Sequence, residues 1–178
     1  MNALGIDPGV PCGYAVVRSQ GGNLILLTAE TLSPPRHLTA YAERAYWVAL
    51  QLVEVYTVYL PHLVAIEQPI IAGPKAGKGA DALNLSMQVG MTYALLHQVA
   101  HPNRTEPIMF INPATIKARF AGSGRATKDT MLRAAKVQFG IDLGRATHAA
   151  DAVAVATVAL SRHHAEWYGL TPKKGART

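Results

Sequence analysis

The order of the strand-like and helix-like segments limits the fold of this chain more than any other feature. Three short strand patterns come first, at residues 2–7, 13–18 and 23–28, and turn residues rich in Pro and Gly separate them. An amphipathic helix pattern follows over residues 38–60, with apolar positions three and four residues apart. Beyond that point, strand and helix patterns alternate. This order predicts antiparallel strands that open a domain and parallel strands that complete it.

The second half of the chain supplies the parallel strands. Residues 62–67 and 107–111 are short apolar runs typical of buried strands. Each is followed by a helix pattern, and capping residues such as Asn112 before Pro113 mark where helices begin. The expected helices lie at residues 81–100, from Asn112 to about residue 120, from the cap Thr127 to about residue 139, and from the cap Thr147 to about residue 164.

We therefore predict an α/β domain with a mixed five-stranded sheet flanked by helices. A chain of 178 residues that is 49% hydrophobic and 16% charged suits one domain with a substantial core. The domain is expected over residues 1–166, and the basic tail at 167–178 is expected to be flexible. Residues 69–80, rich in Gly, Ala and Lys, form the one long loop, and long loops in compact domains are often functional.

The sequence predicts a cytoplasmic protein that does not associate with membranes. Its longest apolar run, residues 152–160, contains Thr157 and is shorter than the roughly 20 residues that cross a bilayer. The N-terminal segment lacks the basic region of a signal peptide. The single Cys12 has no partner for an internal disulfide, which favours a reducing compartment.

The charge balance favours a polyanionic partner. Seventeen Lys and Arg residues against eleven Asp and Glu residues give a formal net charge of +6. Several basic residues gather in one stretch, opposed only by Asp129: Lys117, Arg119, Arg125, Lys128, Arg133 and Lys136. Such a cluster forms either a solvated surface or a surface that binds nucleic acid, and charge alone does not choose between the two.

Three carboxylates occupy unusual places in the predicted elements. Asp7 ends the first strand before a Pro-Gly turn, where a plain turn aspartate is the simpler explanation. Glu67 ends an apolar strand, where a carboxylate is costly unless it is paired or bound to a cation. Asp151 lies in a helix that is small and apolar on nearly every face, with His148 one turn earlier on the same side.

These acids suggest a metal site if they meet at one edge of the sheet. Their mutual repulsion opposes such an arrangement, and divalent cations relieve it, because hard oxygen ligands suit Mg²⁺ and Mn²⁺. Two such ions can activate a water molecule and stabilise the leaving oxygen during displacement at phosphorus. Hydrolysis of phosphodiesters would also fit the basic surface.

Four short motifs in this order resemble the RuvC family of Holliday junction resolvases, which has an RNase H-like fold. The motifs are Gly5-Ile6-Asp7 with Gly13-Tyr14, Ala65-Ile66-Glu67-Gln68, the segment 112–128, and His148-Ala-Ala-Asp151. The resemblance implies a structure-specific endonuclease that resolves four-way DNA junctions by paired symmetric nicks in recombination and repair. It also implies 5′-phosphate and 3′-hydroxyl products.

The resemblance implies that Asp7, Glu67, His148 and Asp151 are the catalytic residues and the ligands of Mg²⁺ or Mn²⁺, with two ions in each active site. Many members of the family have Asp where this chain has His148. Imidazole is a softer ligand than carboxylate, so we expect His148 to favour Mn²⁺ over Mg²⁺.

The resemblance also assigns residues to DNA. Lys117 and Lys128 match basic positions of the family, where contacts to phosphate position the DNA without reading bases. Family members place an aromatic residue soon after the Glu-Gln pair to unstack bases, and this chain has Pro69-Ile70-Ile71 instead. Ile70 or Ile71 is the candidate replacement. The remaining candidates for DNA contact are Arg119, Arg125, Lys75 and Lys78.

The expected partners are branched DNA and a second copy of the chain. Branch-migration machinery is a further candidate partner. The helix at 81–100 carries apolar residues around its circumference, so we expect burial on more than one side, either within the core or between its own sheet and a second subunit. Other functions stay open: a broader nuclease for forks and flaps, or a junction-binding protein without catalysis. A phosphate-binding ATPase of the actin and sugar-kinase type is disfavoured, since 178 residues do not provide its two domains.

Overall fold

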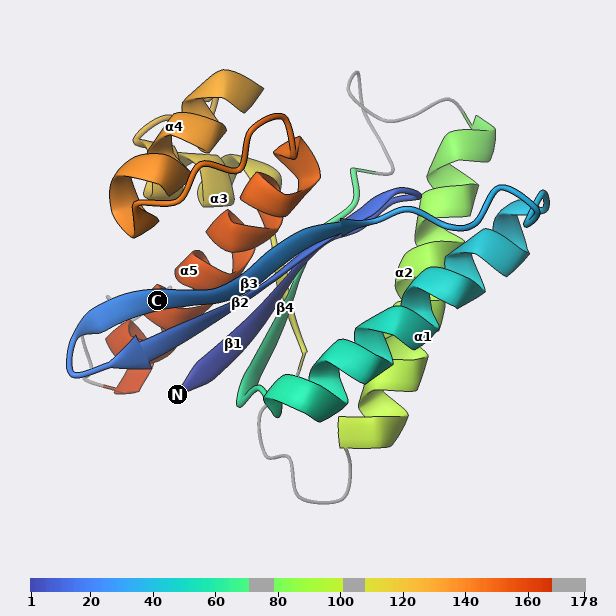
Figure 1. The fold of residues 1–178 in the computed structure, drawn as a ribbon, viewed down its shortest axis with the longest axis horizontal. Helices are drawn as coiled ribbons and strands as arrows, with labels where there is room; N and C mark the ends of the chain where they lie inside the picture. The colour runs from blue at the N-terminus through green and yellow to red at the C-terminus, as the bar shows by residue number, and fades with distance from the viewer. Residues whose placement is uncertain (71–78, 101–107, 168–178) are drawn as a thin grey trace, which may run out of the picture.

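A mixed five-stranded sheet forms the centre of the computed structural model, which describes residues 1–70, 79–100 and 108–167 (Figure 1). The strand order is β3-β2-β1-β4-β5. The β1–β2 and β2–β3 pairs are antiparallel, whereas the β1–β4 and β4–β5 pairs are parallel, as predicted. The strands are β1 (Asn2–Asp7), β2 (Cys12–Gln20), β3 (Asn23–Leu32), β4 (Leu63–Glu67) and β5 (Met109–Ile111).

The hairpin of β2 and β3 is longer than the sequence predicted. Its two-residue turn is Gly21-Gly22, with φ angles of 58° and 83°, a backbone conformation that glycine adopts without steric cost. The strands continue past the predicted ends to Gln20 and Leu32 because their outer parts pair with each other, and a bulge occurs between Val16 and Val17.

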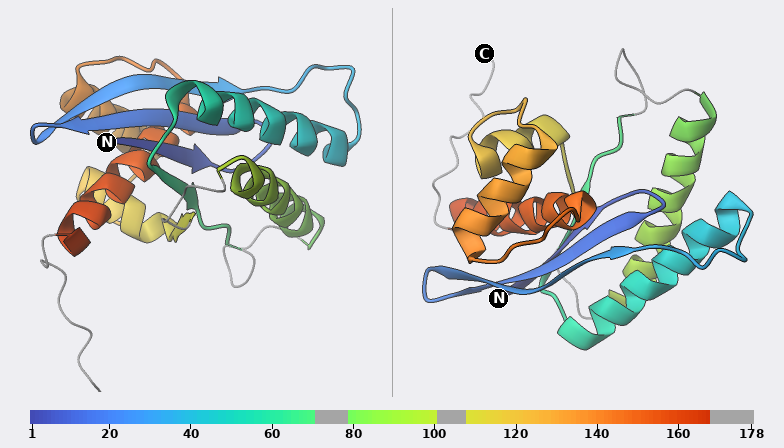
Figure 2. Two further views of the ribbon diagram at one scale, coloured as in Figure 1. Left: turned by 90° about the horizontal axis from the view of Figure 1, so that it is seen from below. Right: turned by 45° about the horizontal axis from the view of Figure 1, so that its top comes forward.

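Among the described residues, five helices cover the two faces of the sheet. Helices α1 and α2 lie together on one face, and α3, α4 and α5 lie on the other, as Figures 1 and 2 show. The helices are α1 (Tyr41–Tyr59), α2 (Gly79–Ala100), α3 (Pro113–Ala121), α4 (Lys128–Phe139) and α5 (Thr147–Trp167).

The helix ends follow local chemistry. Asn112 accepts a hydrogen bond from the Ala114 nitrogen at 2.9 Å and Thr127 accepts one from the Thr130 nitrogen at 3.3 Å, so both predicted caps are confirmed. Three predicted starts were wrong. Helix α2 begins at Gly79 and not at residue 81. Helix α1 begins three residues later than expected, because Leu38 donates to the Pro35 carbonyl in a turn. Thr147 is the first helical residue of α5 and not the residue before it.

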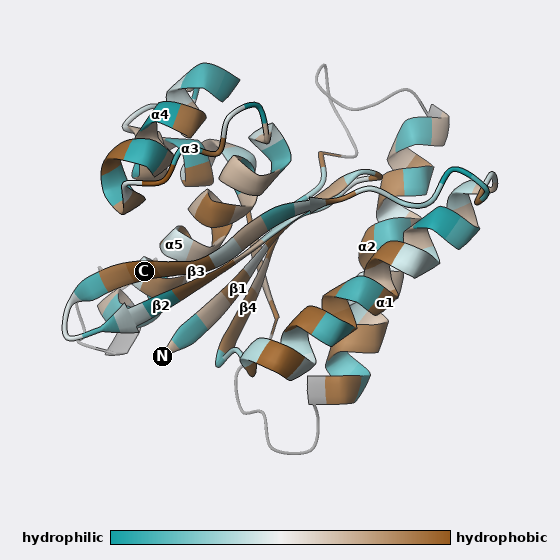
Figure 3. Cartoon of the chain, viewed as in Figure 1, coloured by the Kyte–Doolittle hydropathy of each residue, from teal (hydrophilic) through white to brown (hydrophobic). Residues whose placement is uncertain are grey.

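Two cores lie on opposite sides of the sheet. Side chains alternate along each strand, so Leu4 and Ile6 face α1 and α2, whereas Ala3 faces α5. Hydrophobic residues follow the strands and α5 in Figure 3. The core beneath α1 and α2 contains large side chains, and the core beneath α5 is rich in alanine.

Helix α2 is buried along one stripe only. Gln88, Thr92 and Leu96 are fully buried or nearly so, whereas Leu83 is 71% exposed and Tyr93 is 39% exposed. Within one chain α2 is buried on one side, so its explanation as an all-round core helix was wrong, whereas cover of the other side by a second subunit stays a prediction. The stripe packs against α1 and the sheet, and the opposite side lies on the surface.

Two predictions fall at or beyond the edges of the described residues. The predicted domain boundary at residue 166 lies next to the end of α5 at Trp167. The tail after residue 167 and most of the loop at 69–80 lie outside the described residues. In the part of the chain that the structure describes, no helix combines the length and the apolar character needed to cross a membrane.

Candidate active site

Asp7 and Glu67 lie at one edge of the sheet. They are the last residues of β1 and β4, which are parallel neighbours with Ile6 paired to Ile66. The alternation that turns Ile6 and Ile66 toward α1 and α2 places both carboxylates on the face covered by α5. These two acids lie at the same edge of the sheet, as predicted, because β1 and β4 are parallel neighbours and end side by side.

Helix α5 brings the other two predicted residues to the same place. The Nδ1 atom of His148 lies 2.7 Å from an Asp7 carboxylate oxygen, a contact between residues 141 positions apart in the chain. This hydrogen bond is the largest cause that raises the pKa of His148 above its ordinary value. Asp151, one turn further along α5, is coupled electrostatically to Asp7 and Glu67.

The carboxylates oppose one another's ionisation. Burial, followed by the negative charges of Asp7 and Asp151, raises the pKa of Glu67 from 4.5 to about 8. Burial and the charge of Asp7 likewise raise the pKa of Asp151 from 3.8 to about 6. Lys117 lowers both pKa values, and this opposition is weaker than the burial that raises them.

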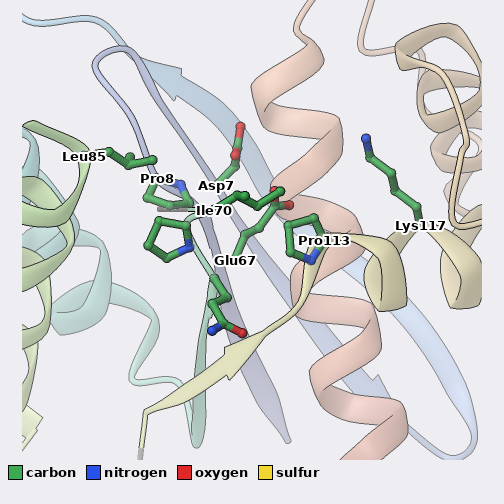
Figure 4. Close-up of a pocket in the computed structure, with 9 residues that line it drawn as sticks. Asp7, Pro8, Glu67, Ile70, Leu85, Pro113 and Lys117 are labelled. Atoms are coloured by element: carbon green, nitrogen blue, oxygen red, sulfur yellow. The ribbon is translucent and has the colours of Figure 1, made fainter. Parts of the chain in front are cut away.

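Lys117 reaches the site from α3. Strand β5 leads directly into α3 through the Asn112 cap, and the Gln68 nitrogen donates to the Ile111 carbonyl at 2.9 Å, which ties the end of β4 to the start of this connection. Figure 4 shows Lys117 projecting from α3 beside the carboxylates of Asp7 and Glu67. This predicted DNA contact therefore lies in the same site as the acids.

A hollow of about 290 Å³ opens beside the two strand ends. Ile70 contributes to its wall and is 40% exposed, so this candidate for unstacking bases is at the mouth of the site (Figure 4). The hollow is lined by Asp7, Pro8, Glu67, Gln68, Pro69, Ile70, Leu85, Pro113 and Lys117.

The other predicted DNA contacts are distributed around this site. Lys128 begins α4, is exposed, and its charge lowers the pKa values of His148 and Asp151, so it belongs to the same electrostatic environment. Arg119 and Arg125 are exposed and do not line the hollow. Ile71, Lys75 and Lys78 lie outside the described residues.

Sequence reasoning missed two features of the site. Leu85 of α2 lines the hollow, and only the packing of α2 beside the strand ends brings it there. The direct bond between Asp7 and His148 was also missed, since the sequence indicated two independent metal ligands. The sequence contained a signal for two further residues that line the hollow, Pro8 and Pro113. Each directly follows a residue that the sequence had singled out, Asp7 and the cap Asn112 respectively.

The donor atoms are near one another without forming a closed metal cage. In the ranges 1–70, 79–100 and 108–167, no three His, Cys, Asp or Glu side chains already stand close enough to hold an ion. The chemistry of the set nevertheless fits a divalent cation, since burial and neighbouring negative charge raise the pKa values of Glu67 and Asp151 beside Asp7. Rotation of the Asp7 and His148 side chains away from each other would free both for coordination.

Comparison with known proteins identifies the family. A sequence model of the family described as "Crossover junction endodeoxyribonuclease RuvC" matches residues 3–159. A protein of that name from Dehalococcoides mccartyi is 32% identical over 168 residues, which cover 93% of this chain and 92% of the relative. Another from Anaeromyxobacter sp. is 36% identical over 163 residues, which cover 91% of this chain and 74% of the relative.

Solved structures share the fold. "T. thermophilus RuvC in complex with Holliday junction substrate" superimposes with a TM-score of 0.75 at 24% identity, covering 92% of this chain and 96% of that one. The yeast mitochondrial Holliday junction resolvase Ydc2 gives a TM-score of 0.62 at 15% identity, covering 95% and 84%. The predicted RNase H-like architecture is thus confirmed. With a family match over most of its length, this chain belongs to the RuvC family of crossover junction endodeoxyribonucleases.

Proposed function

We propose that this chain resolves four-way DNA junctions by paired nicks, with Asp7, Glu67, His148 and Asp151 as its catalytic residues. The observation that carries this proposal is the meeting of β1, β4 and α5 at one sheet edge, where burial and the charge of Asp7 raise the pKa values of Glu67 and Asp151 beside Lys117. A site built only for stability would pair each carboxylate with a cation. Here three carboxylates share one site, and burial together with neighbouring negative charge keeps the pKa of Glu67 and that of Asp151 raised despite Lys117.

The four residues would hold Mg²⁺ or Mn²⁺, in two positions as the family resemblance implies. When bound, divalent ions activate a water molecule and stabilise the oxygen that leaves phosphorus. Glu67 and Asp151 supply hard oxygen ligands, and a cation beside them would favour their ionised forms and lower their pKa values. Asp7 lies on β1 and His148 lies on α5. These two side chains would bind the cation from opposite sides after the hydrogen bond between them breaks.

Lys117 would hold the phosphate that is to be cleaved. Its position in the wall of the hollow, next to Asp7 and Glu67, suits a cation that positions the DNA backbone over the acids. Lys128, Arg119 and Arg125 would extend the same phosphate track across α3 and α4. Ile70 at the mouth would enter a base step and help to open the crossover.

Two copies of the chain would act together. Leu83 and Tyr93 leave apolar surface on the outer side of α2, and Tyr93 stacks on Phe110 of the edge strand β5 with ring centroids 6.1 Å apart. We propose that this surface pairs with that of a second copy, because a twofold dimer presents two active sites to a junction with approximate twofold symmetry. Light scattering of the wild type and of Tyr93→Glu tests this: we expect a dimer for the former and a monomer for the latter.

The decisive experiment compares substrates and metals. Wild-type protein and Asp7→Asn are incubated with labelled four-way junction, fork and linear duplex, in Mg²⁺ and separately in Mn²⁺. We expect symmetric nicks confined to the junction, lost in the variant while junction binding persists. Equal cleavage of forks would indicate a general branched-DNA nuclease. Tight binding without cleavage in either metal would indicate a junction-binding protein and contradict the proposal.

The metal preference tests the role of His148 separately. Imidazole is softer than carboxylate, so the wild type should cleave faster in Mn²⁺ than in Mg²⁺ at equal concentration. The variant His148→Asp should shift this preference toward Mg²⁺, and His148→Ala should lose activity in both. Equal rates of the wild type in the two metals would contradict a ligand role for His148.

A further inference from the structure

Gly13 lies at the point where β2 passes directly under the first turn of α5. In the ladder between β1 and β2, Gly13 is the residue opposite Asp7. A Cβ atom added to Gly13 would overlap the carbonyl group of His148 and would lie 3.1 Å from the Ala149 nitrogen. These are backbone atoms of a helix, so they cannot rotate aside as the end of a flexible side chain can. Any residue larger than glycine must therefore lift this turn of α5 or displace the end of β2.

A second glycine supports α5 further along. A Cβ at Gly5 of β1 would overlap the Ala152 carbonyl and lie 2.9 Å from the Ala156 Cα atom. The contacted positions, His148, Ala152 and Ala156, are four residues apart and so lie on one face of the helix. Helix α5 thus rests on the backbone of two strands, and Gly13 is the support nearest the site.

The close contact at Gly13 determines whether His148 can reach Asp7. The two side chains are joined by one hydrogen bond of 2.7 Å. Such a bond weakens once its two heavy atoms lie more than about 3.2 Å apart, so a small movement of the helix is enough to break it. We propose that Gly13 is a positioning residue of the active site: by having no side chain, it lets the first turn of α5 approach β2 closely enough for His148 to act together with Asp7. This inference rests on the proposed function, since it concerns the same site.

The placement of Gly13 separates this role from ordinary packing. Gly13 does not line the hollow, and a side chain at this position would meet the backbone of His148 and Ala149. Glu67 lies on β4, whereas Lys117 lies on α3, which packs against α5. The expected defect is therefore largest in the half of the site that α5 supplies.

Gly13→Ala in the full chain tests the proposal with Mn²⁺ alone as the probe. Electron paramagnetic resonance measures Mn²⁺ affinity without requiring cleavage, and a nitrogen-edited proton spectrum detects the His148 ring proton bonded to Asp7 in metal-free protein. We expect Gly13→Ala to weaken Mn²⁺ binding by about tenfold or more and to remove the bonded proton signal. Gly90→Ala is the matched control for an added methyl group, since a Cβ there meets no atom of the chain within 4 Å. Because Gly90 lies on the same side of α2 as Leu83 and Tyr93, its oligomeric state is measured alongside.

A second control separates positioning from loss of stability. Leu52→Ala truncates a fully buried side chain on the inner side of α1. It should lower the melting temperature, and it changes no residue of α5. It should bind Mn²⁺ like the wild type at temperatures where both are folded. If Gly13→Ala does not fold, Ala149→Ser takes its place, because Ala149 is fully buried in the turn that Gly13 contacts and a larger side chain there tests whether that turn controls Mn²⁺ binding.

A double-mutant cycle supplies the outcome that contradicts the proposal. If Gly13 acts through α5, adding Gly13→Ala to His148→Ala should weaken Mn²⁺ binding by less than Gly13→Ala alone does, because the contribution of His148 is already lost and only that of Asp151 remains to be reduced. If Gly13→Ala weakens Mn²⁺ binding as much in the His148→Ala protein as in the wild type, the inference is wrong. Wild-type Mn²⁺ affinity in Gly13→Ala itself would also overturn it. A wild type that binds Mn²⁺ but cleaves no junction would overturn the proposed function alone, since the affinity and proton signals would still test Gly13.

Discussion

The two faces of the sheet are built on different principles. Beneath α1 and α2, strand β1 presents Leu4 and Ile6, and large side chains fill the space between helix and sheet. Beneath α5, the same strand presents Ala3 and Gly5, and the helix touches the strand backbone. Large side chains can repack around a small change, whereas backbone in contact with backbone cannot. The tightly packed face is the one that carries the active site.

The largest expected effect comes from enlarging a side chain on the α5 face. Ala152→Leu adds volume where helix and strand are already in contact, so we expect a loss of about 3 kcal/mol or more in the free energy of unfolding. Cleavage should disappear as well, because Asp151 and His148 move with the helix. Urea denaturation measures the first effect and a junction assay the second. Leu52→Met on the other face is the volume-conserving control.

A cavity on the other face should separate stability from activity. Leu52→Ala beneath α1 should lower the free energy of unfolding by about 2 to 3 kcal/mol. Because α5 does not contact this position, the cleavage rate well below the melting temperature should stay close to that of the wild type. A rate that falls in proportion to stability would show that the two faces are not independent, contrary to the comparison.

The pH dependence of stability should originate on the α5 face. The pKa of Glu67 rises from 4.5 to about 8 and that of Asp151 from 3.8 to about 6 on folding. Both groups bind protons more tightly when folded, so their stabilisation is complete below pH 4 and is lost as the pH rises toward 8. His148, with a raised pKa, changes stability in the same direction.

Metal-free protein should therefore lose several kcal/mol of stability between about pH 5 and about pH 8. Calorimetry across this range measures the loss, and Glu67→Gln should remove most of it, because the amide does not ionise. Added Mn²⁺ should also reduce the loss by favouring the ionised carboxylates. Stability that increases over this range would contradict the raised pKa values.

The smallest expected effect concerns two lysines on the same side of the sheet. Lys117 lines the hollow, whereas Lys136 forms an exposed ion pair with Asp142 at 2.7 Å. Replacing a lysine that contacts phosphate reduces the salt dependence of DNA binding by about 0.9 in the logarithmic slope. We expect this reduction for Lys117→Gln and little change for Lys136→Gln. Equal slopes for the two variants would place Lys117 away from the DNA backbone.

Much of this arrangement could be predicted from the sequence, because its causes are local. The period of the apolar residues predicted the strands, and the Asn112 and Thr127 side chains predicted where α3 and α4 begin. The acids were found because Glu67 and Asp151 interrupt apolar segments, where a charge needs an explanation. Family motifs added His148 to that set.

What sequence could not predict depends on contacts between distant segments. The pairing of Gly13 with Asp7 and the overlap of its missing side chain with α5 require the tertiary structure. The single-sided burial of α2 was missed because an all-round apolar helix does not show which of its sides remains on the surface of one chain. The extra length of β3 was missed because it depends on pairing with β2 and not on hydrophobic pattern.

The bond between Asp7 and His148 joins the beginning of the chain to its last helix, 141 residues later. Two of the residues that we propose as catalytic are therefore synthesised near the beginning and near the end of translation. A chain still emerging from the ribosome has Asp7 and then Glu67, but it lacks half of the site until α5 has been translated and has packed on the sheet. Completion of the fold and the ability to damage DNA should thus arise in the same step, which spares the cell from nicks made by unfinished copies of the enzyme.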